Sequence, residues 1–202
     1  MASPPTSPRA KSIDFNRDHL VLLLAVAGAS VDAAIFLAFG VFSAAQTGNV
    51  IILAAAVAQG RLTTGFRSVV SVVGYIGGSA VGELVILGRR GSDPPLAAAG
   101  RALATELAPL FSLFVCWRLT GAAPTLATAV ALIALAAIAM GIQGAAVLRI
   151  HSAPATTYIT GSLTIFTTGM IRWLRFVETA PERSAKEQDL SSIGEKLADL
   201  GL

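Results

Sequence analysis

The sequence predicts an all-α membrane protein, a helical bundle of six transmembrane helices. Only 13 % of its 202 residues are charged and the mean hydropathy is +0.70, whereas a soluble domain carries roughly 25 % charged residues. The charges gather at both ends of the chain and in short gaps between long apolar runs. These runs are too continuous for the alternating strands of a β-barrel, so helices must satisfy the backbone in lipid.

The six expected helices follow from the apolar runs, although the second run is short for a span of about 20 residues. They give a transmembrane domain over residues 19–176, after a Pro/Ser-rich disordered tail over 1–18. The polar tail 177–202 carries leucines and an isoleucine at helical spacing, which predicts a short amphipathic helix. The expected helices cover residues 20–42, 47–59, 66–87, 102–119, 124–148 and 158–176.

The basic residues predict the orientation, because Lys and Arg are enriched on the cytoplasmic side. Six crossings place both tails on one side together with eleven of the fifteen Lys and Arg residues. Both termini are therefore expected in the cytoplasm. The four residues on the other side oppose this trend: Arg89, Arg90, Arg101 and Arg149.

Several functional classes are not expected. The basic residues are scattered at the ends of apolar runs, so a nucleic-acid partner is not expected. Cys116 is the single cysteine, which excludes an intramolecular disulfide and a cysteine metal site. His19 and His151 fall on opposite sides of the expected bundle, and no phosphate loop or hydrolase motif occurs. We therefore expect no enzyme activity, no cofactor and no metal.

A short pattern of glycine and threonine residues occurs twice in the chain. Gly28 and Gly141 are 113 residues apart, and so are the pairs Thr47-Gly48 and Thr160-Gly161. An internal repeat would match helices one and two with helices five and six, and helices one and five would then cross in the same direction. Chance is the alternative, because Gly, Ala and Thr are abundant in this chain.

The candidate binding site consists of the two repeated Thr-Gly helix starts and a carboxylate in the first helix. Asp32 is expected near the bilayer centre, where a charge costs several kcal/mol unless it is protonated, paired or wetted. A Thr-Gly helix start exposes backbone N–H groups that suit an anion or a carbonyl. Two alternatives stay open: a protonated Asp32 bonded to a neighbouring helix, and helix starts that are merely capped. The expected site residues are Asp32, Gln46, Thr47, Gly48, Asn49, Gln143, Thr160 and Gly161.

Two further features predict packing rather than binding. Glu83 and Glu106 are expected at similar depth near the arginines of the 89–101 segment, where interfacial ion pairs would neutralise them. Gly74, Gly78 and Gly82 form a stripe of small residues on one helix face. Such a stripe lets helices pack closely, either within the bundle or between the subunits of a homo-oligomer.

The motifs "AGASVDAAIF", "QTGN", "GYIGGSAVGE", "MGIQGAA" and "TYITGSL" occur in this order. Together they resemble the YoaK-type family of bacterial inner-membrane proteins, a domain of unknown function that has been proposed to move small metabolites. The resemblance implies six helices in the bacterial cytoplasmic membrane and assigns the family motifs to Asp32, Thr47 to Asn49, Gln143 and Thr160-Gly161. The family usually has Asn after that glutamine, whereas this chain has Gly144.

The first functional hypothesis is a secondary transporter or permease for a small metabolite, with Asp32 and the Thr-Gly helix starts lining its site. Its partners would be the lipid bilayer and an unidentified small solute. The alternative is a non-transporting membrane scaffold or sensor that assembles through the face of Gly74, Gly78 and Gly82. A membrane enzyme ranks third, because a single central Asp32 has no second catalytic group at a defined spacing.

Overall fold

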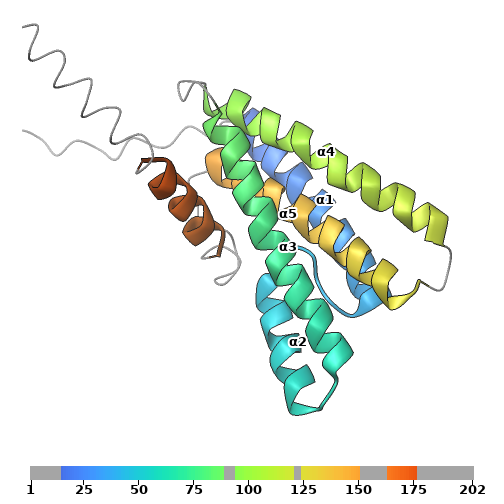
Figure 1. The fold of residues 1–202 in the computed structure, drawn as a ribbon. Coiled ribbons are helices and arrows are strands. Elements are labelled where there is room, and N and C mark those ends of the chain that lie inside the picture. Colours follow the sequence, from blue (N-terminus) through green and yellow to red (C-terminus); the bar gives the residue numbers. More distant parts are fainter. Residues whose placement is uncertain (1–14, 89–93, 121–123, 151–162, 177–202) are drawn as a thin grey trace, which may run out of the picture.

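The computed structural model describes residues 15–88, 94–120, 124–150 and 163–176, and within these ranges the regular structure is entirely helical (Figure 1). The all-α prediction is therefore confirmed. The helices are α1 (Phe15–Phe39), α2 (Gln46–Ala58), α3 (Leu62–Leu87), α4 (Pro95–Thr120), α5 (Leu126–Ile150) and a last helix over 163–176.

Four helices, α1, α3, α4 and α5, are long and apolar enough to cross a membrane. The 13 residues of α2 extend only about 20 Å at 1.5 Å per residue, which is short of the roughly 30 Å hydrocarbon core. The last helix is of similar length. Six full crossings are therefore not confirmed, and four candidate spans support a multi-pass membrane protein.

The helix ends have local causes. Gly40, Gly60 and Gly88 have positive φ values of 72°, 66° and 48°, and they follow α1, α2 and α3 directly or closely. Glycine adopts this backbone conformation at little cost. Helix α4 starts at Pro95, earlier than expected, because proline fits a first helical turn. Helix α1 starts at Phe15, inside the tail expected over 1–18.

Two apolar clusters fix the directions of the long helices. At one end of the bundle, Leu20 near the start of α1 packs with Ile86 at the end of α3, Ala99 at the start of α4 and Ile150 at the end of α5. At the other end, the end of α1 packs with the end of α4 and the start of α5. Helices α1 and α4 thus run one way, while α3 and α5 run the other way.

The expectation that the first and fifth helices cross in the same direction is therefore wrong. Helix α2 does not cross the bundle. The chain consequently makes one crossing fewer between α1 and α5 than six full spans would require, and α5 runs antiparallel to α1.

Helix α5 is the central element, and it packs closely against α3. A Cβ atom at Gly78 would collide with the backbone of Ile138 on α5, and one at Gly141 would collide with the backbone of Tyr75 on α3. A Cβ at Gly82 would lie 3.0 Å from the Ala145 Cβ. Together with Gly74, these α3 glycines lie against α5 of the same chain, which is the close approach that small residues permit.

Candidate functional site

After α1 the chain folds back toward Asp32, whose carboxylate accepts four hydrogen bonds. Its Oδ1 atom accepts from the Ser43 N–H at 2.6 Å, the Ser43 Oγ at 2.7 Å and the Ala44 N–H at 2.6 Å. Its Oδ2 atom accepts from the Ala45 N–H at 3.0 Å. Since both oxygens accept, the arrangement fits an ionised carboxylate rather than the protonated one that the sequence left open.

This carboxylate satisfies the backbone N–H groups of the three residues that lead into α2. Ala45, the N-cap residue of α2, has no side chain that could accept a hydrogen bond from the first turn. Backbone N–H groups just before a helix need acceptors when water is excluded. Asp32 supplies them from a different helix, which ties the start of α2 to α1.

The contact places the start of α2 inside the bundle. Asp32 lies seven residues before the end of α1, or about 10 Å along the helix axis. From there α2 runs outward beside the first half of α3 (Figure 1). Asn49 near the start of α2 donates to Ser71 at 3.0 Å, while Gly65 near the start of α3 lies against Ala56 at the end of α2.

Polar side chains of the "QTGN" stretch hold residues 40–45, the fold-back segment that connects α1 to α2. The side chain of Asn49 accepts from the Phe42 N–H and donates to the Phe42 carbonyl, both at 2.8 Å. The Gln46 amide donates to the Ser43 carbonyl at 2.8 Å. Both side chains are fully buried. Both side chains therefore bond to groups of this chain, namely the Ser43 and Phe42 backbone and, for Asn49, also the Gln46 and Ser71 side chains.

Gly48 and Thr47 differ from these two. A Cβ at Gly48 would lie 2.7 Å from the ring of Phe42, which stacks on Phe36 with 4.5 Å between the ring centroids. Glycine is thus needed here for aromatic packing. The Thr47 hydroxyl is buried and has no hydrogen-bond partner in the part of the chain that the structure describes. Its hydrogen-bonding capacity is therefore not used by the described fold.

These features can be compared with known proteins. A family model described as "Protein of unknown function (DUF1275)" matches residues 20–192. The chain belongs to the DUF1275 family. It is also similar to the UPF0700 transmembrane protein YoaK of Bacillus subtilis (strain 168), with 32 % identity over 149 residues. That match covers 73 % of this chain and 64 % of YoaK. No solved structure matches the chain.

The family assignment confirms the resemblance drawn from the motifs, and the described helices agree with the transmembrane character named for YoaK. The relative's name states no substrate, and this chain spans less than two thirds of its length. The chemistry of the DUF1275 site must therefore be argued from the residues.

Gln143 of this DUF1275 protein lies apart from the start of α2. Its amide Nε2 donates to the Leu24 carbonyl of α1 at 3.2 Å, and its Oε1 lies 3.0 Å from the Cβ position of Gly28. Gly28 precedes Asp32 by one helical turn. Gln143 is thus near Asp32 along α1 without bonding to it. Thr160 and Gly161, the expected second helix start, lie outside the described residues.

Tyr75 is a central residue that the sequence reasoning missed. Its hydroxyl is hydrogen-bonded to the Thr164 hydroxyl of the last helix at 2.9 Å. Around it meet Val31 of α1, Ala44 of the fold-back segment and Met140 of α5. A tyrosine within the glycine stripe was a usable signal, because a buried tyrosine hydroxyl needs a partner.

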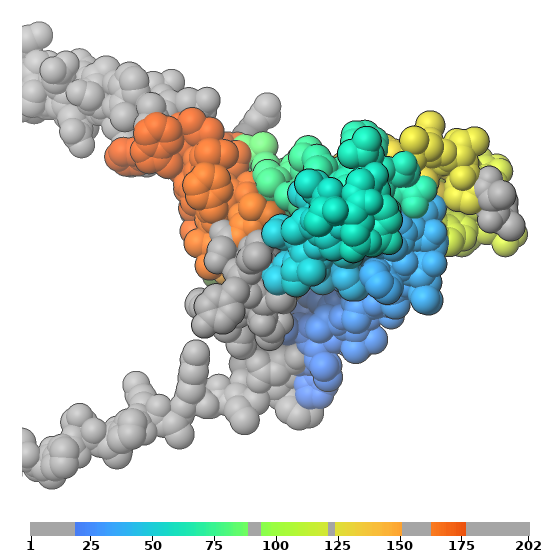
Figure 2. Space-filling view, turned by 90° about the horizontal axis from the view of Figure 1, so that it is seen from below, coloured from blue at the N-terminus to red at the C-terminus, as the bar shows by residue number. Residues whose placement is uncertain are grey.

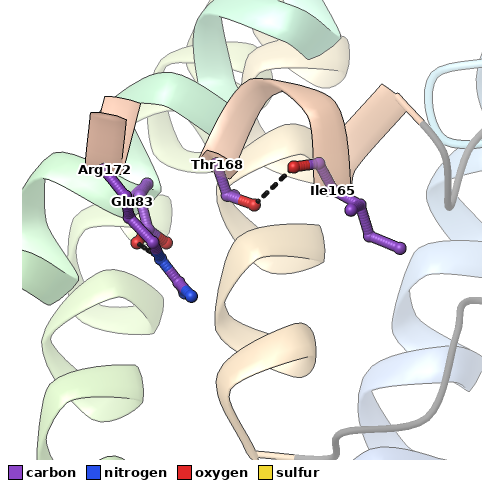
Figure 3. Close-up of polar contacts among 4 residues, drawn as sticks. All are labelled: Glu83, Ile165, Thr168 and Arg172. Atoms are coloured by element: carbon purple, nitrogen blue, oxygen red, sulfur yellow. Dashed lines mark hydrogen bonds and ion pairs between the residues drawn. The ribbon is translucent and has the colours of Figure 1, made fainter. Parts of the chain in front are cut away.

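The last helix is fixed by an ion pair between a buried glutamate and a half-exposed arginine. Arg172 Nε lies 2.6 Å from Glu83 Oε1 on α3, and the Glu83 side chain is 1 % exposed (Figure 3). Arg175 also donates to the Gly88 carbonyl at 3.1 Å. Glu83 was expected to pair with arginines of the 89–101 segment; its partner among the described residues is Arg172. Because Thr164 lies beside Tyr75, the last helix runs from mid-bundle toward the end of α3.

The last helix and α2 therefore point to opposite ends of the bundle. Figure 2 shows the last helix in orange at one end and the end of α4 with the start of α5, in yellow, at the other. Helix α2 ends beside the start of α3, and the first half of α3 packs at the end of the bundle formed by the end of α4 and the start of α5.

Two apolar grooves lie on the outer surface of the helices. One of about 330 Å³ runs between α1 and α4, and its lining includes Val31, Leu113 and Trp117. The other, of about 500 Å³, lies between α3 and α5 and includes Gly77 and Ile138. Asp32 and the "QTGN" residues line neither groove. Both grooves have apolar walls, as expected of protein surfaces that face lipid.

Proposed function

We propose that this protein is a secondary permease for a small metabolite in the bacterial cytoplasmic membrane. The observation that supports the proposal is the start of α2, which lies within the bundle and carries polar backbone held by the Asp32 carboxylate. Irregular backbone at membrane depth is tolerated where protein covers it or where it lines a cavity. Helices interrupted near the midplane are typical of secondary transporters.

Asp32 has a positioning role in this proposal. Its two oxygens are occupied by donors from Ser43, Ala44 and Ala45, so it holds the start of α2 rather than a solute. The same contact places a negative charge where an anion would otherwise bind. The solute is therefore uncharged or cationic near this helix start. The Thr47 hydroxyl and the Gln143 amide are the polar groups offered to it.

We also propose an orientation based on four crossings. The end of the bundle where α1 starts then carries both tails, the α3–α4 connection and the end of α5. This end collects twelve of the fifteen basic residues, and the other end has Arg61, Arg67 and Arg118. The Arg89–Arg101 segment now agrees with the positive-inside rule. Both termini are cytoplasmic in this arrangement.

The pattern of glycine and threonine residues that occurs twice fits an inverted repeat in this orientation. Helices α1 and α5 run antiparallel, and the short helices that follow them point to opposite ends. Such repeats are related by an axis in the membrane plane and are common in secondary transporters. The scaffold alternative is less supported, since the face of Gly74, Gly78 and Gly82 lies against α5 of the same chain.

The proposal is tested by reconstituting the full chain in liposomes and measuring uptake of a panel of labelled metabolites. We expect flux of at least one uncharged or cationic metabolite with the native protein, and loss of that flux with Asp32→Asn. The carboxamide retains one acceptor oxygen but presents an NH₂ group toward the Ala45 N–H. Ser30→Ala is the matched control, because Ser30 is exposed on the same helix and its hydroxyl donates to the Val26 carbonyl of that helix. Absence of flux across the panel, or normal flux with Asp32→Asn, would overturn the proposal.

A further inference from the structure

Three described carboxylates lie within the candidate membrane spans, and they differ in how they are neutralised. Asp32 accepts four hydrogen bonds, and Glu83 pairs with Arg172. Glu106 on α4 is 5 % exposed. Among the described residues it forms no hydrogen bond and no ion pair. It is thus the one of these three carboxylates without a fixed partner.

Glu106 lies further from the start of its helix than its place in the sequence suggested. Since α4 starts at Pro95, Glu106 is eleven residues into the helix, or about 16 Å along its axis. Ala102, one turn earlier on the same face, packs against Ala145 and Ala146 of α5. The expected position of Glu106 in the first turns of the fourth helix is therefore wrong, because the helix begins at Pro95, seven residues before residue 102.

The residues that follow Glu106 on its face of α4 are apolar. Leu110 and Leu113 follow it on the same face of α4 and line the groove against α1. Among the described residues, none of the ionisable side chains on the neighbouring helices or on α4 itself forms a hydrogen bond or an ion pair with Glu106. They are His19 and Asp32 on α1, Arg67, Tyr75 and Glu83 on α3, Arg101, Cys116 and Arg118 on α4, Arg149 on α5, and Arg172 and Arg175 on the last helix.

An isolated carboxylate in such a place is too costly to keep ionised, and it becomes neutral by taking up a proton. We propose that Glu106 is a proton-binding site within the membrane, and that the proton it exchanges is the coupling ion of the permease. The step is the reversible conversion of a carboxylate and a proton into a carboxylic acid, with no other bond formed or broken. The coupling role rests on the proposed permease function; the proton binding does not.

Proton binding is tested without transport. Infrared spectroscopy of the purified full chain in lipid bilayers reports the C=O stretch of a protonated carboxylic acid. We expect this band at neutral pH in the native protein and its loss in Glu106→Gln. Glu83→Gln is the control and keeps the band, because Glu83 is ionised against Arg172. Absence of the band in the native protein, or its persistence in Glu106→Gln, would overturn the proposal. Absence of the band in the native protein can be observed even if the Glu106→Gln variant fails to fold.

Coupling is tested in liposomes with any metabolite that the native protein carries. We expect Glu106→Gln to lose accumulation driven by a pH gradient while it retains exchange of labelled for unlabelled metabolite. Gradient-driven accumulation equal to the native level would refute coupling through Glu106. If no metabolite is carried at all, the permease proposal fails, and the infrared result alone decides whether Glu106 binds a proton.

Discussion

The backbone N–H and the hydroxyl of Ser43 both donate to one oxygen of Asp32, Oδ1, across the break between two helices. Eleven residues separate the two, and the chain between them includes the end of α1 and a glycine with positive φ. The contact explains how α2 can start inside the bundle with a polar backbone. It also makes Asp32 the main support of that start.

We therefore expect Asp32→Ala to destabilise the protein strongly. The substitution removes every acceptor for the Ser43, Ala44 and Ala45 N–H groups. Hydrogen bonds to a charged group contribute about 1.5–3 kcal/mol each, and buried unpaired donors add a cost, so a loss of about 3 kcal/mol or more is expected. Thermal unfolding in detergent measures it. Ser30→Ala should leave the midpoint unchanged, and equal midpoints for both variants would contradict the assignment.

The second prediction concerns two adjacent glycines of α3. Gly78→Ala should destabilise the protein by about 1–3 kcal/mol, the range for overpacking a close contact, because its Cβ would meet the Ile138 backbone. Gly77→Ala is the matched control. A Cβ at Gly77 has nothing within 4 Å, and alanine is the better helix former.

Unfolding midpoints of the two variants, together with their oligomeric state by light scattering, separate the two uses of the glycine stripe. Loss of stability in Gly78→Ala with an unchanged particle mass supports packing within the chain. A stable Gly78→Ala variant whose particle mass falls would instead favour assembly between subunits.

The third prediction concerns the ion pair between Glu83 and Arg172. Removing either partner should destabilise the attachment of the last helix, and the double variant Glu83→Gln/Arg172→Gln should lose less than the sum of the single variants. Glu83 is 1 % exposed and the Arg172 side chain is 49 % exposed. The coupling should therefore be smaller than the about 3–5 kcal/mol lost when a fully buried pair is broken.

A double-mutant cycle on the unfolding free energy measures this coupling. Arg175→Gln combined with Glu83→Gln is the control, because Arg175 donates to the Gly88 carbonyl instead. In this control, the losses of unfolding free energy caused by Arg175→Gln and by Glu83→Gln should add. Additivity in the Glu83–Arg172 cycle itself would show that the pair does not hold the last helix.

Hydropathy was sufficient to predict the class of the fold and the approximate place of each apolar helix. It could not separate a full span from a short helix that starts inside the bundle, because both read as apolar runs with a polar beginning. That distinction depends on Asp32 reaching Ser43 to Ala45, a tertiary contact with no local signal. The wrong direction for α5 followed directly from counting α2 as a crossing.

For the candidate site too, the sequence indicated which residues matter but not the tertiary contacts that they form. The structure places Asp32 and the polar residues of "QTGN" around the same segment before α2, because Asp32 and Gln46 both bond to Ser43 and Asn49 bonds to Phe42. Their roles were not visible, because most of their polar atoms bond to backbone of the fold-back segment. Glu106 was misplaced for a different reason: an Ala-rich stretch after Pro95 extends α4, so this carboxylate lies eleven residues into the helix instead of near its start.

The last prediction tests the four-crossing orientation. Single cysteines are placed at Gln59, Pro94 and Thr125 in a Cys116→Ala background, and whole cells are labelled with a membrane-impermeant maleimide. Four crossings place Gln59, at the end of α2, and Thr125, before α5, outside the cell, while Pro94 lies in the cytoplasm. We therefore expect labelling at Gln59 and Thr125, and labelling at Pro94 only after the cells are opened. Six crossings predict the reverse at all three positions, so the opposite pattern would reject both the four-crossing orientation and the inverted repeat proposed from it.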